Sequence, residues 1–215
     1  MLQAYISCVR GMRQLTDMVD TDSHWGALDI FLPKFKNDCQ NIGAWTTDVL
    51  RFIGIPTIHE YTPQWQNKCK RHYWCASLDT IGIFRPYTPP DNNLMEDWDT
   101  NLRYAGKVYA KTFGANKNTP YFIKSADECV PEELNSPLLD DQTYRYHQCV
   151  TLKMPLNVST QNKVCYLCFF DKDGGLNAVG WGKIDIEEKM AIFENVPLNI
   201  MFFPAIYDRN EYTAI

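Results

Sequence analysis

A cysteine and a histidine in this chain stand where a thiol nucleophile and its base are expected. Cys39 lies where a polar loop gives way to an apolar-periodic run, and His72 opens a β-rich run. A cysteine in the first turn of a helix has its thiolate stabilised by free backbone N–H groups and by the positive end of the helix dipole. An imidazole within hydrogen-bond reach would complete a thiolate–imidazolium pair that attacks an amide carbonyl and protonates the departing amine. The two residues therefore predict acyl transfer or amide hydrolysis.

A helix, a strand and a hairpin must position this pair. Apolar residues at helical spacing predict a helix that begins at Cys39 and buries the face made of Ile42, Trp45, Val49, Leu50 and Ile53. Gly54 and Pro56 predict the end of this helix. Residues 57–61 predict a strand, and residues 72–79 and 82–87 predict a hairpin. Spacing alone does not prove that the cysteine and the histidine meet, because the strand and a polar loop separate them.

Four further residues are candidates for the site, and each has an ordinary structural alternative. Trp74 shares a strand face with His72, so it either walls the site or packs in the core beneath the sheet. Tyr61 and Trp65 flank a Pro-Gln turn, where they either line a substrate groove or pack the loop. Asn37 is a candidate oxyanion donor, with an ordinary helix cap as the alternative.

These residues together resemble the core of the transglutaminase-like superfamily. The segments that carry the resemblance are DCQN at 38–41, VLRFIGIP at 49–56, YTPQW at 61–65 and HYW at 72–74. More narrowly, the chain is similar to large bacterial surface proteins that contain this core. The resemblance implies an α+β fold with papain-like geometry, in which the cysteine helix packs on an antiparallel sheet. It also implies a cysteine amidase, peptidase or acyltransferase that acts on a protein or peptide substrate and needs no metal or organic cofactor.

The resemblance further implies an aspartate on the strand after the histidine strand, where it would orient the imidazole. A tight turn that pairs Asp79 with Gly82 places this acidic position near Thr88, and no carboxylate stands there. Asp91, in the following loop, is the candidate because it could bend back. If no acid reaches His72, the alternative function is a catalytically inactive binding or interaction module that retains the core.

The composition argues against several other classes of protein function. Hydrophobic residues at 45% and charged residues at 22% are typical of a globular chain. The net charge of -5 argues against a nucleic-acid surface. No apolar run reaches the roughly 18 to 20 residues that span a bilayer, and the first five residues lack signal-peptide features. Because the resembling proteins are exported, we expect a fragment or processed form of a longer bacterial surface protein.

The eight cysteines lack the spacing of a disulfide framework, so we expect mostly free thiols. Cys165 and Cys168 resemble half of a zinc site, but they lie in a strand-like run where positions three apart face opposite sides of the sheet. We therefore expect both to be buried apolar residues and expect no metal site.

The pattern of strands and loops predicts three regions along the chain. Residues 1–100 form the predicted cysteine-containing core, residues 101–145 an irregular connecting segment, and residues 146–215 a small all-β domain. Within the last region, short apolar runs predict an antiparallel, sandwich-like unit with strands at 148–156, 163–170, 178–186, 190–193 and 199–207.

Overall fold

The computed structural model describes residues 39–89 and 102–215, and its chain divides into two compact units. Among the described residues, the first unit comprises 39–60 and 72–89, and the second comprises 61–71 and 102–215. Helices and antiparallel strands occur together, which confirms the predicted α+β class. Residues 102–145 belong to the same unit as the strands that follow them.

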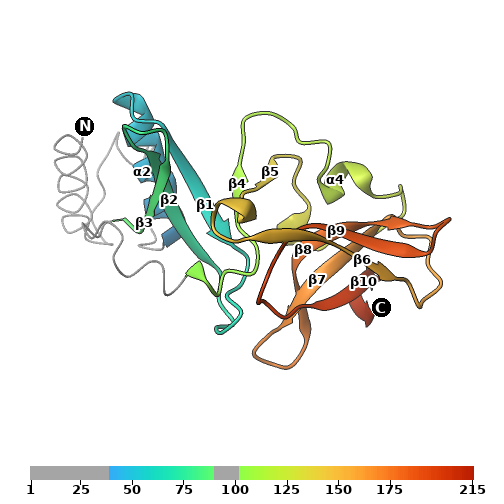
Figure 1. Cartoon of the computed structure of the whole chain (residues 1–215). Coiled ribbons are helices and arrows are strands. Elements are labelled where there is room, and N and C mark those ends of the chain that lie inside the picture. The colour runs from blue at the N-terminus through green and yellow to red at the C-terminus, as the bar shows by residue number, and fades with distance from the viewer. Residues whose placement is uncertain (1–38, 90–101) are drawn as a thin grey trace, which may run out of the picture. The chain divides into compact units, whose positions relative to one another are not determined.

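The first unit is a helix on a small antiparallel sheet (Figure 1). Its elements are α2 (Cys39–Phe52), β1 (Thr57–Thr62), β2 (His72–Leu78) and β3 (Phe84–Tyr87), with β2 between its neighbours in the sheet. Leu50, Ile55, Cys75 and Tyr87 form the buried cluster between helix and strands, and Trp45 packs against it. Helix α2 and strand β2 thus share one hydrophobic core.

Helix α2 begins and ends where the sequence predicts, but its buried face is turned. The chain leaves the helix through Gly54 at φ +83°, and the N–H of Ile55 donates to the carbonyl of Leu50 at 2.8 Å. The buried residues are Gly43, Thr46, Thr47 and Leu50, whereas Ile53 is 46% exposed. The predicted face is correct at Leu50 and Trp45 and wrong at Ile53, because the small residues Gly43, Thr46 and Thr47 complete the buried face.

The predicted hairpin forms, with a register one residue away from the predicted one. Leu78 pairs with Phe84 and Cys75 pairs with Tyr87. The turn is longer than expected because the Asp79 carboxylate accepts hydrogen bonds from the backbone N–H groups of Ile81 and Ile83, each at 2.9 Å. The position opposite His72 therefore moves from residue 89 to residue 90, which lies outside the described residues.

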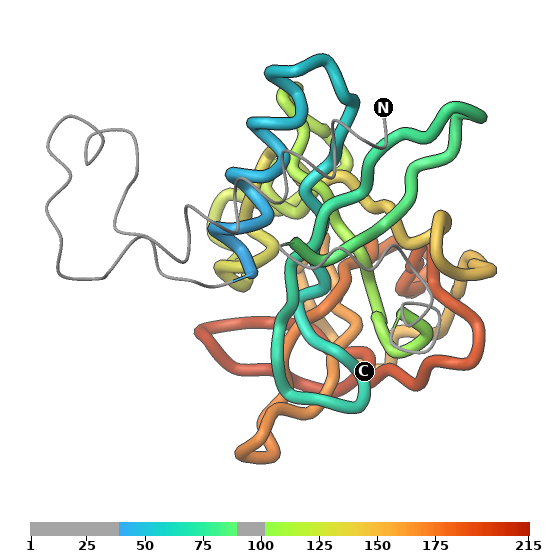
Figure 2. Tube along the Cα trace, turned by 90° about the vertical axis from the view of Figure 1, so that its left-hand side faces the viewer, coloured from blue at the N-terminus to red at the C-terminus, as the bar shows by residue number. Residues whose placement is uncertain are grey.

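The second unit is built on a six-stranded antiparallel sheet in the order β11-β10-β7-β8-β9-β6 (Figure 1). Its strands are β6 (Cys149–Pro155), β7 (Val164–Phe170), β8 (Leu176–Asp185), β9 (Met190–Pro197), β10 (Phe203–Asp208) and β11 (Glu211–Ala214). The turn at 171–175 that joins β7 to β8 projects from this sheet (Figure 2). Five of the six strands confirm predicted runs, although they form one sheet and the sandwich-like arrangement is not confirmed.

Residues 102–145 add short elements to this unit. They are β4 (Tyr109–Lys111), α4 (Pro120–Ile123), η2 (Glu132–Leu134), β5 (Leu139–Asp141) and η3 (Thr143–Arg145), and β4 pairs with β5. The Tyr109 hydroxyl donates to the carbonyl of Val179 at 3.1 Å, so this layer lies against β8. Cys165, Leu167 and Phe193 belong to the hydrophobic cluster of the unit.

A segment from between β1 and β2 completes the second unit. The Gln64 side chain donates to the carbonyl of Phe170 at 2.7 Å and accepts from the Asn177 amide at 2.8 Å. Gln64 is 4% exposed, so both hydrogen bonds lie in the interior of the unit. The predicted polar excursion between β1 and β2 is therefore a structural part of the second unit.

Candidate functional site

Cys39 is the first residue of α2, and its thiol is free and half-buried. This is the position that the sequence predicts for a nucleophile, because the first-turn N–H groups of a helix lack intrahelical partners. Cys39 precedes Gly43 by one turn, so its side chain lies on the same side of α2 as the buried stripe. Cys39 is therefore on the side of α2 that faces the sheet.

The contacts of α2 show which end of the sheet lies near Cys39. The Cys75 thiol donates to the carbonyl of Gly43 at 3.2 Å, and the Arg51 guanidinium donates to the carbonyl of Thr57 at 2.8 Å. Helix α2 and β1 consequently run in opposite directions, and β2, which is antiparallel to β1, runs with the helix. Cys39 lies about 6 Å before Gly43 along the axis of α2. His72 lies about 10 Å before Cys75 along β2. The two predicted residues are thus at the same end of the first unit.

The face of the sheet beneath α2 carries His59 and Cys75. A Cβ at Gly43 would lie 2.7 Å from the Nε2 of His59, and the Thr47 hydroxyl lies 3.4 Å from the Cys75 sulfur. Tyr73 joins them, since its ring centroid is 5.3 Å from that of His59. Burial raises the pKa of the Cys75 thiol to about 12, so this sulfur is a neutral core group.

The opposite face of the sheet carries Trp74 and Glu60. The indole N–H of Trp74 donates to the Glu60 carboxylate at 3.0 Å, and both residues are fully buried. The ring of His72 lies 6.2 Å from that of Trp74, nearly parallel to it. Because side chains alternate along a strand, His72 belongs to the face of Trp74, and His59 is the histidine on the face of α2. The sequence alone does not distinguish the two histidines, since nothing in it tells which face of the sheet a helix covers.

The other predicted site residues are dispersed. Tyr61 and Trp65 are buried in the second unit, where the Tyr61 ring lies 5.9 Å from that of Tyr109. Asp91 and Asn37 lie outside the described residues, so their predicted roles are untested.

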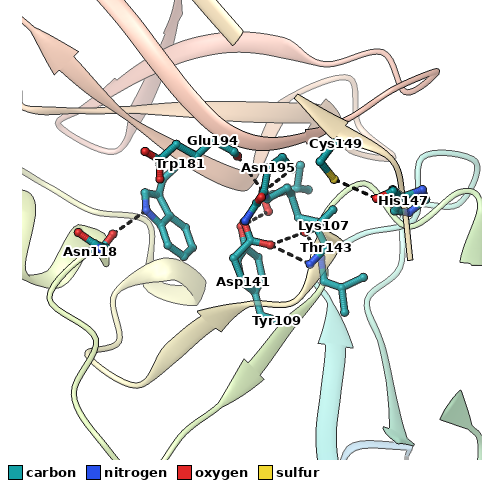
Figure 3. Close-up of polar contacts among 12 residues, drawn as sticks. Lys107, Tyr109, Asn118, Asp141, Thr143, His147, Cys149, Trp181, Glu194 and Asn195 are labelled. Atoms are coloured by element: carbon teal, nitrogen blue, oxygen red, sulfur yellow. Dashed lines mark hydrogen bonds and ion pairs between the residues drawn. The ribbon is translucent and has the colours of Figure 1, made fainter. Parts of the chain in front are cut away.

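A second group of polar side chains lies in the second unit and was not predicted (Figure 3). The Lys107 ammonium, almost fully buried, forms an ion pair with Asp141 and donates to the backbone carbonyls of Glu194 and Asn195 at 3.3 and 2.9 Å. Asp141 also accepts hydrogen bonds from the backbone N–H and the hydroxyl of Thr143. This network joins β5 to β9 in the interior of the unit.

Buried thiols elsewhere in the second unit have no reactive character. Burial raises the pKa of Cys165 and of Cys168 to about 12, and both lie in the interior of β7 as predicted. Within residues 39–89 and 102–215, no group of three or more His, Cys, Asp or Glu side chains is placed to hold a metal ion. No helix in the same ranges is long and apolar enough to cross a membrane.

Comparison of the chain with protein-family models, with curated proteins and with solved structures found no match. The transglutaminase-like resemblance therefore rests on the sequence motifs alone.

Proposed function

We propose that this protein is a transglutaminase-like cysteine amidase or acyltransferase that acts on a protein or peptide substrate with Cys39 as its nucleophile. The observation that carries the proposal is the position of Cys39, a half-buried free thiol at the first residue of α2 and at the end of the unit where β2 begins. First-turn N–H groups would stabilise both the thiolate and the oxyanion of the tetrahedral intermediate.

In this proposal His72 acts as the general base and then as the general acid. It is the first residue of β2, so its backbone is constrained by the strand on one side only. Attack by the Cys39 thiolate on the amide carbonyl forms a thioester and releases the amine, which takes its proton from the imidazolium. Water or a second amine then attacks the thioester, which gives hydrolysis or acyl transfer.

A non-catalytic binding module is the second candidate, and one observation favours it. The alternation of β2 places His72 with Trp74 and Glu60, on the face opposite to the contact between Gly43 and Cys75. An imidazole held on that face would not reach the Cys39 thiol. The protein would then retain the core and recognise a protein or peptide without cleaving it.

The pH dependence of iodoacetamide labelling, read at each cysteine by mass spectrometry, separates the two candidates. An enzyme labels Cys39 rapidly near pH 6, and both His72→Ala and His72→Gln abolish this labelling. The exposed Cys69 thiol and the buried Cys75 thiol are internal references for accessible and inaccessible sulfur. Labelling of Cys39 in step with Cys69 at every pH, unchanged in the His72 variants, would reject catalysis and favour the binding module. The variant His59→Gln tests whether the imidazole on the face of α2 acts in place of His72.

A further inference from the structure

A cavity of about 170 Å³ opens in the second unit beside the Lys107 network. Its walls come from Asn116 and Asn118, from β5, and from β8 and β9. The cavity has room for several water molecules, which is the scale of a small polar ligand. All of its lining residues belong to the second unit, so this cavity is independent of the site proposed around Cys39.

Trp181 of β8 forms a rigid aromatic wall of this cavity (Figure 3). Its indole N–H donates to the carbonyl of Asn118 at 2.9 Å, and its ring stacks on Tyr109 at 5.1 Å with an interplanar angle of 16°. Tyr109 is itself fully buried and bonded to the carbonyl of Val179. The indole is therefore held at its N–H edge by Asn118 and on one ring face by Tyr109, and Trp181 remains half-buried at the cavity wall.

Another part of the cavity wall is shaped by a break in the pairing of β9. Register shifts between Val150 and Leu152 of β6, so that Glu194 and Asn195 lie opposite a single residue. Asn195 has φ +51°, a conformation that non-glycine residues seldom adopt. The carbonyls of both residues turn inward to the Lys107 ammonium. Bulges of this kind are frequent next to functional sites, where they change the direction of a side chain.

The polar groups around the cavity are mixed in type and in charge. Glu194 has an exposed carboxylate for which no hydrogen bond is found among the described residues, and it offers acceptors. Lys183 offers a donor, and its ammonium lies 3.4 Å from the side-chain oxygen of Asn118, whose amide nitrogen is a further donor. The Asp141 carboxylate is paired with Lys107. With Asp140, three carboxylates and two ammonium groups lie at or beside the cavity, so its walls hold both signs with one negative charge in excess and offer donors and acceptors to a single ligand.

From these features we propose that the cavity binds one neutral sugar unit, with a face of the sugar ring against Trp181 and hydroxyls on Glu194, Lys183 and Asn118. A hydroxyl group both donates and accepts, which matches the mixed donors and acceptors of the walls. An indole offers the flat apolar surface that the C–H face of a sugar ring needs. A longer glycan would enter the cavity by one terminal unit.

Titration of the full chain with methyl glycosides of glucose, galactose, mannose and N-acetylglucosamine tests the proposal. The readouts are the indole N–H cross-peak of Trp181 in ¹H–¹⁵N spectra, assigned by its disappearance in Trp181→Phe, and the backbone N–H cross-peaks of Asn118 and Lys183, which also line the cavity and remain visible in the Trp181 variants. At least one glycoside should shift these peaks saturably below about 10 mM, and Trp181→Ala should weaken its binding at least about tenfold, the equivalent of one lost stacking contact. Glu194→Gln should weaken it as well, while the matched surface change Glu211→Gln on β11 should leave it unchanged.

Three results would overturn the proposal. They are no shift with any of the four glycosides at about 50 mM, equal binding by Trp181→Ala, and a saturable shift with inorganic phosphate or methylammonium in place of the sugars. The last result would assign the cavity to a charged ligand. Trp181→Phe keeps a ring against Tyr109, so an unshifted spectrum outside the cavity in this variant separates loss of the site from loss of folding.

Discussion

Replacement of Lys107 by methionine tests whether the buried ion pair holds β5 against β9. Methionine keeps the aliphatic stem, which lies against Gly180 of β8, and it removes the ammonium. Three acceptors then lose their donor, namely the Asp141 carboxylate and the carbonyls of Glu194 and Asn195. The side chain of Lys107 is only 2% exposed, so no water replaces the lost hydrogen bonds without a rearrangement.

The expected loss in free energy of unfolding is about 3 kcal/mol. Removal of one partner of a buried pair costs roughly 3 to 5 kcal/mol when the other charge stays buried. Asp141 is 19% exposed and keeps its hydrogen bonds from Thr143, so its charge is partly compensated and the lower end of that range applies. The double variant Lys107→Met, Asp141→Asn should lose only about 1 to 2 kcal/mol, because it leaves no unpaired charge.

Hydrogen exchange of the full chain measures this locally. The N–H of Val108 donates to the Thr143 hydroxyl, and the N–H of Gln142 donates to the carbonyl of Val108, so both amides report on the layer that Lys107 anchors. A loss of about 3 kcal/mol lowers their protection roughly a hundredfold. The single change Asp141→Asn should lower it similarly, since it leaves a buried ammonium with two carbonyls. Two results would refute this reasoning. The first is protection in Lys107→Met within about threefold of the wild-type value. The second is a loss of unfolding free energy in the double variant that equals the sum of the losses in the two single variants.

Further predictions concern three other groups. Glu128 is 6% exposed, and its carboxylate accepts hydrogen bonds from three backbone N–H groups. Glu128→Ala should therefore lower the free energy of unfolding in urea by about 3 kcal/mol, whereas Asp127→Ala, at an exposed neighbour, should lower it by less than about 0.5 kcal/mol. Equal effects of the two changes would show that the Glu128 carboxylate does not stabilise the fold. Gly43→Ala should lower the melting temperature although alanine favours helices, because its Cβ would meet the buried imidazole on β1, and a higher melting temperature would contradict this packing. Burial lowers the pKa of His147, so the unfolded chain binds a proton at this residue more readily than the folded chain does. The free energy of unfolding should therefore fall as the pH drops from about 6.5 through the lowered pKa. Measured as the urea midpoint at each pH, this fall should be smaller in His147→Gln. An unchanged slope in the variant would exclude His147 as the titrating group.

The strands of the second unit could be predicted because each is a short apolar run bounded by turn residues. The register of the hairpin in the first unit could not, because it depends on one side chain. A two-residue turn was the simplest arrangement for residues 79–82, yet the Asp79 carboxylate binds two backbone N–H groups and lengthens the turn. A shift of one residue changes which residues lie opposite each other across the whole hairpin.

The start of α2 at Cys39 was predictable from local features, whereas the direction of His72 was not. Period-two patterns show the faces of a strand only when one face is polar, and Trp74, Cys75 and Ala76 are all buried. The cavity beside Trp181 was equally hidden, because Lys107 and Asp141 are 34 residues apart and the bulge in β9 leaves no mark in its sequence. Local patterns identify elements, and the contacts between distant elements define the sites.

The loop that Gln64 anchors has a consequence for synthesis on the ribosome. Its hydrogen-bond partners at Phe170 and Asn177 follow it by 106 and 113 residues. Because the ribosome adds about 5 to 20 residues per second, the Gln64 side chain lacks both hydrogen-bond partners for several seconds after it is synthesised. Residues 61–71 contact Tyr104, Ala105 and Tyr109, which are synthesised long before β7 and β8, so the two hydrogen bonds of the Gln64 side chain are the late contacts of this loop. The interior of the second unit around Gln64 therefore closes only after β7 and β8 have been synthesised, although the loop itself is made more than 100 residues earlier.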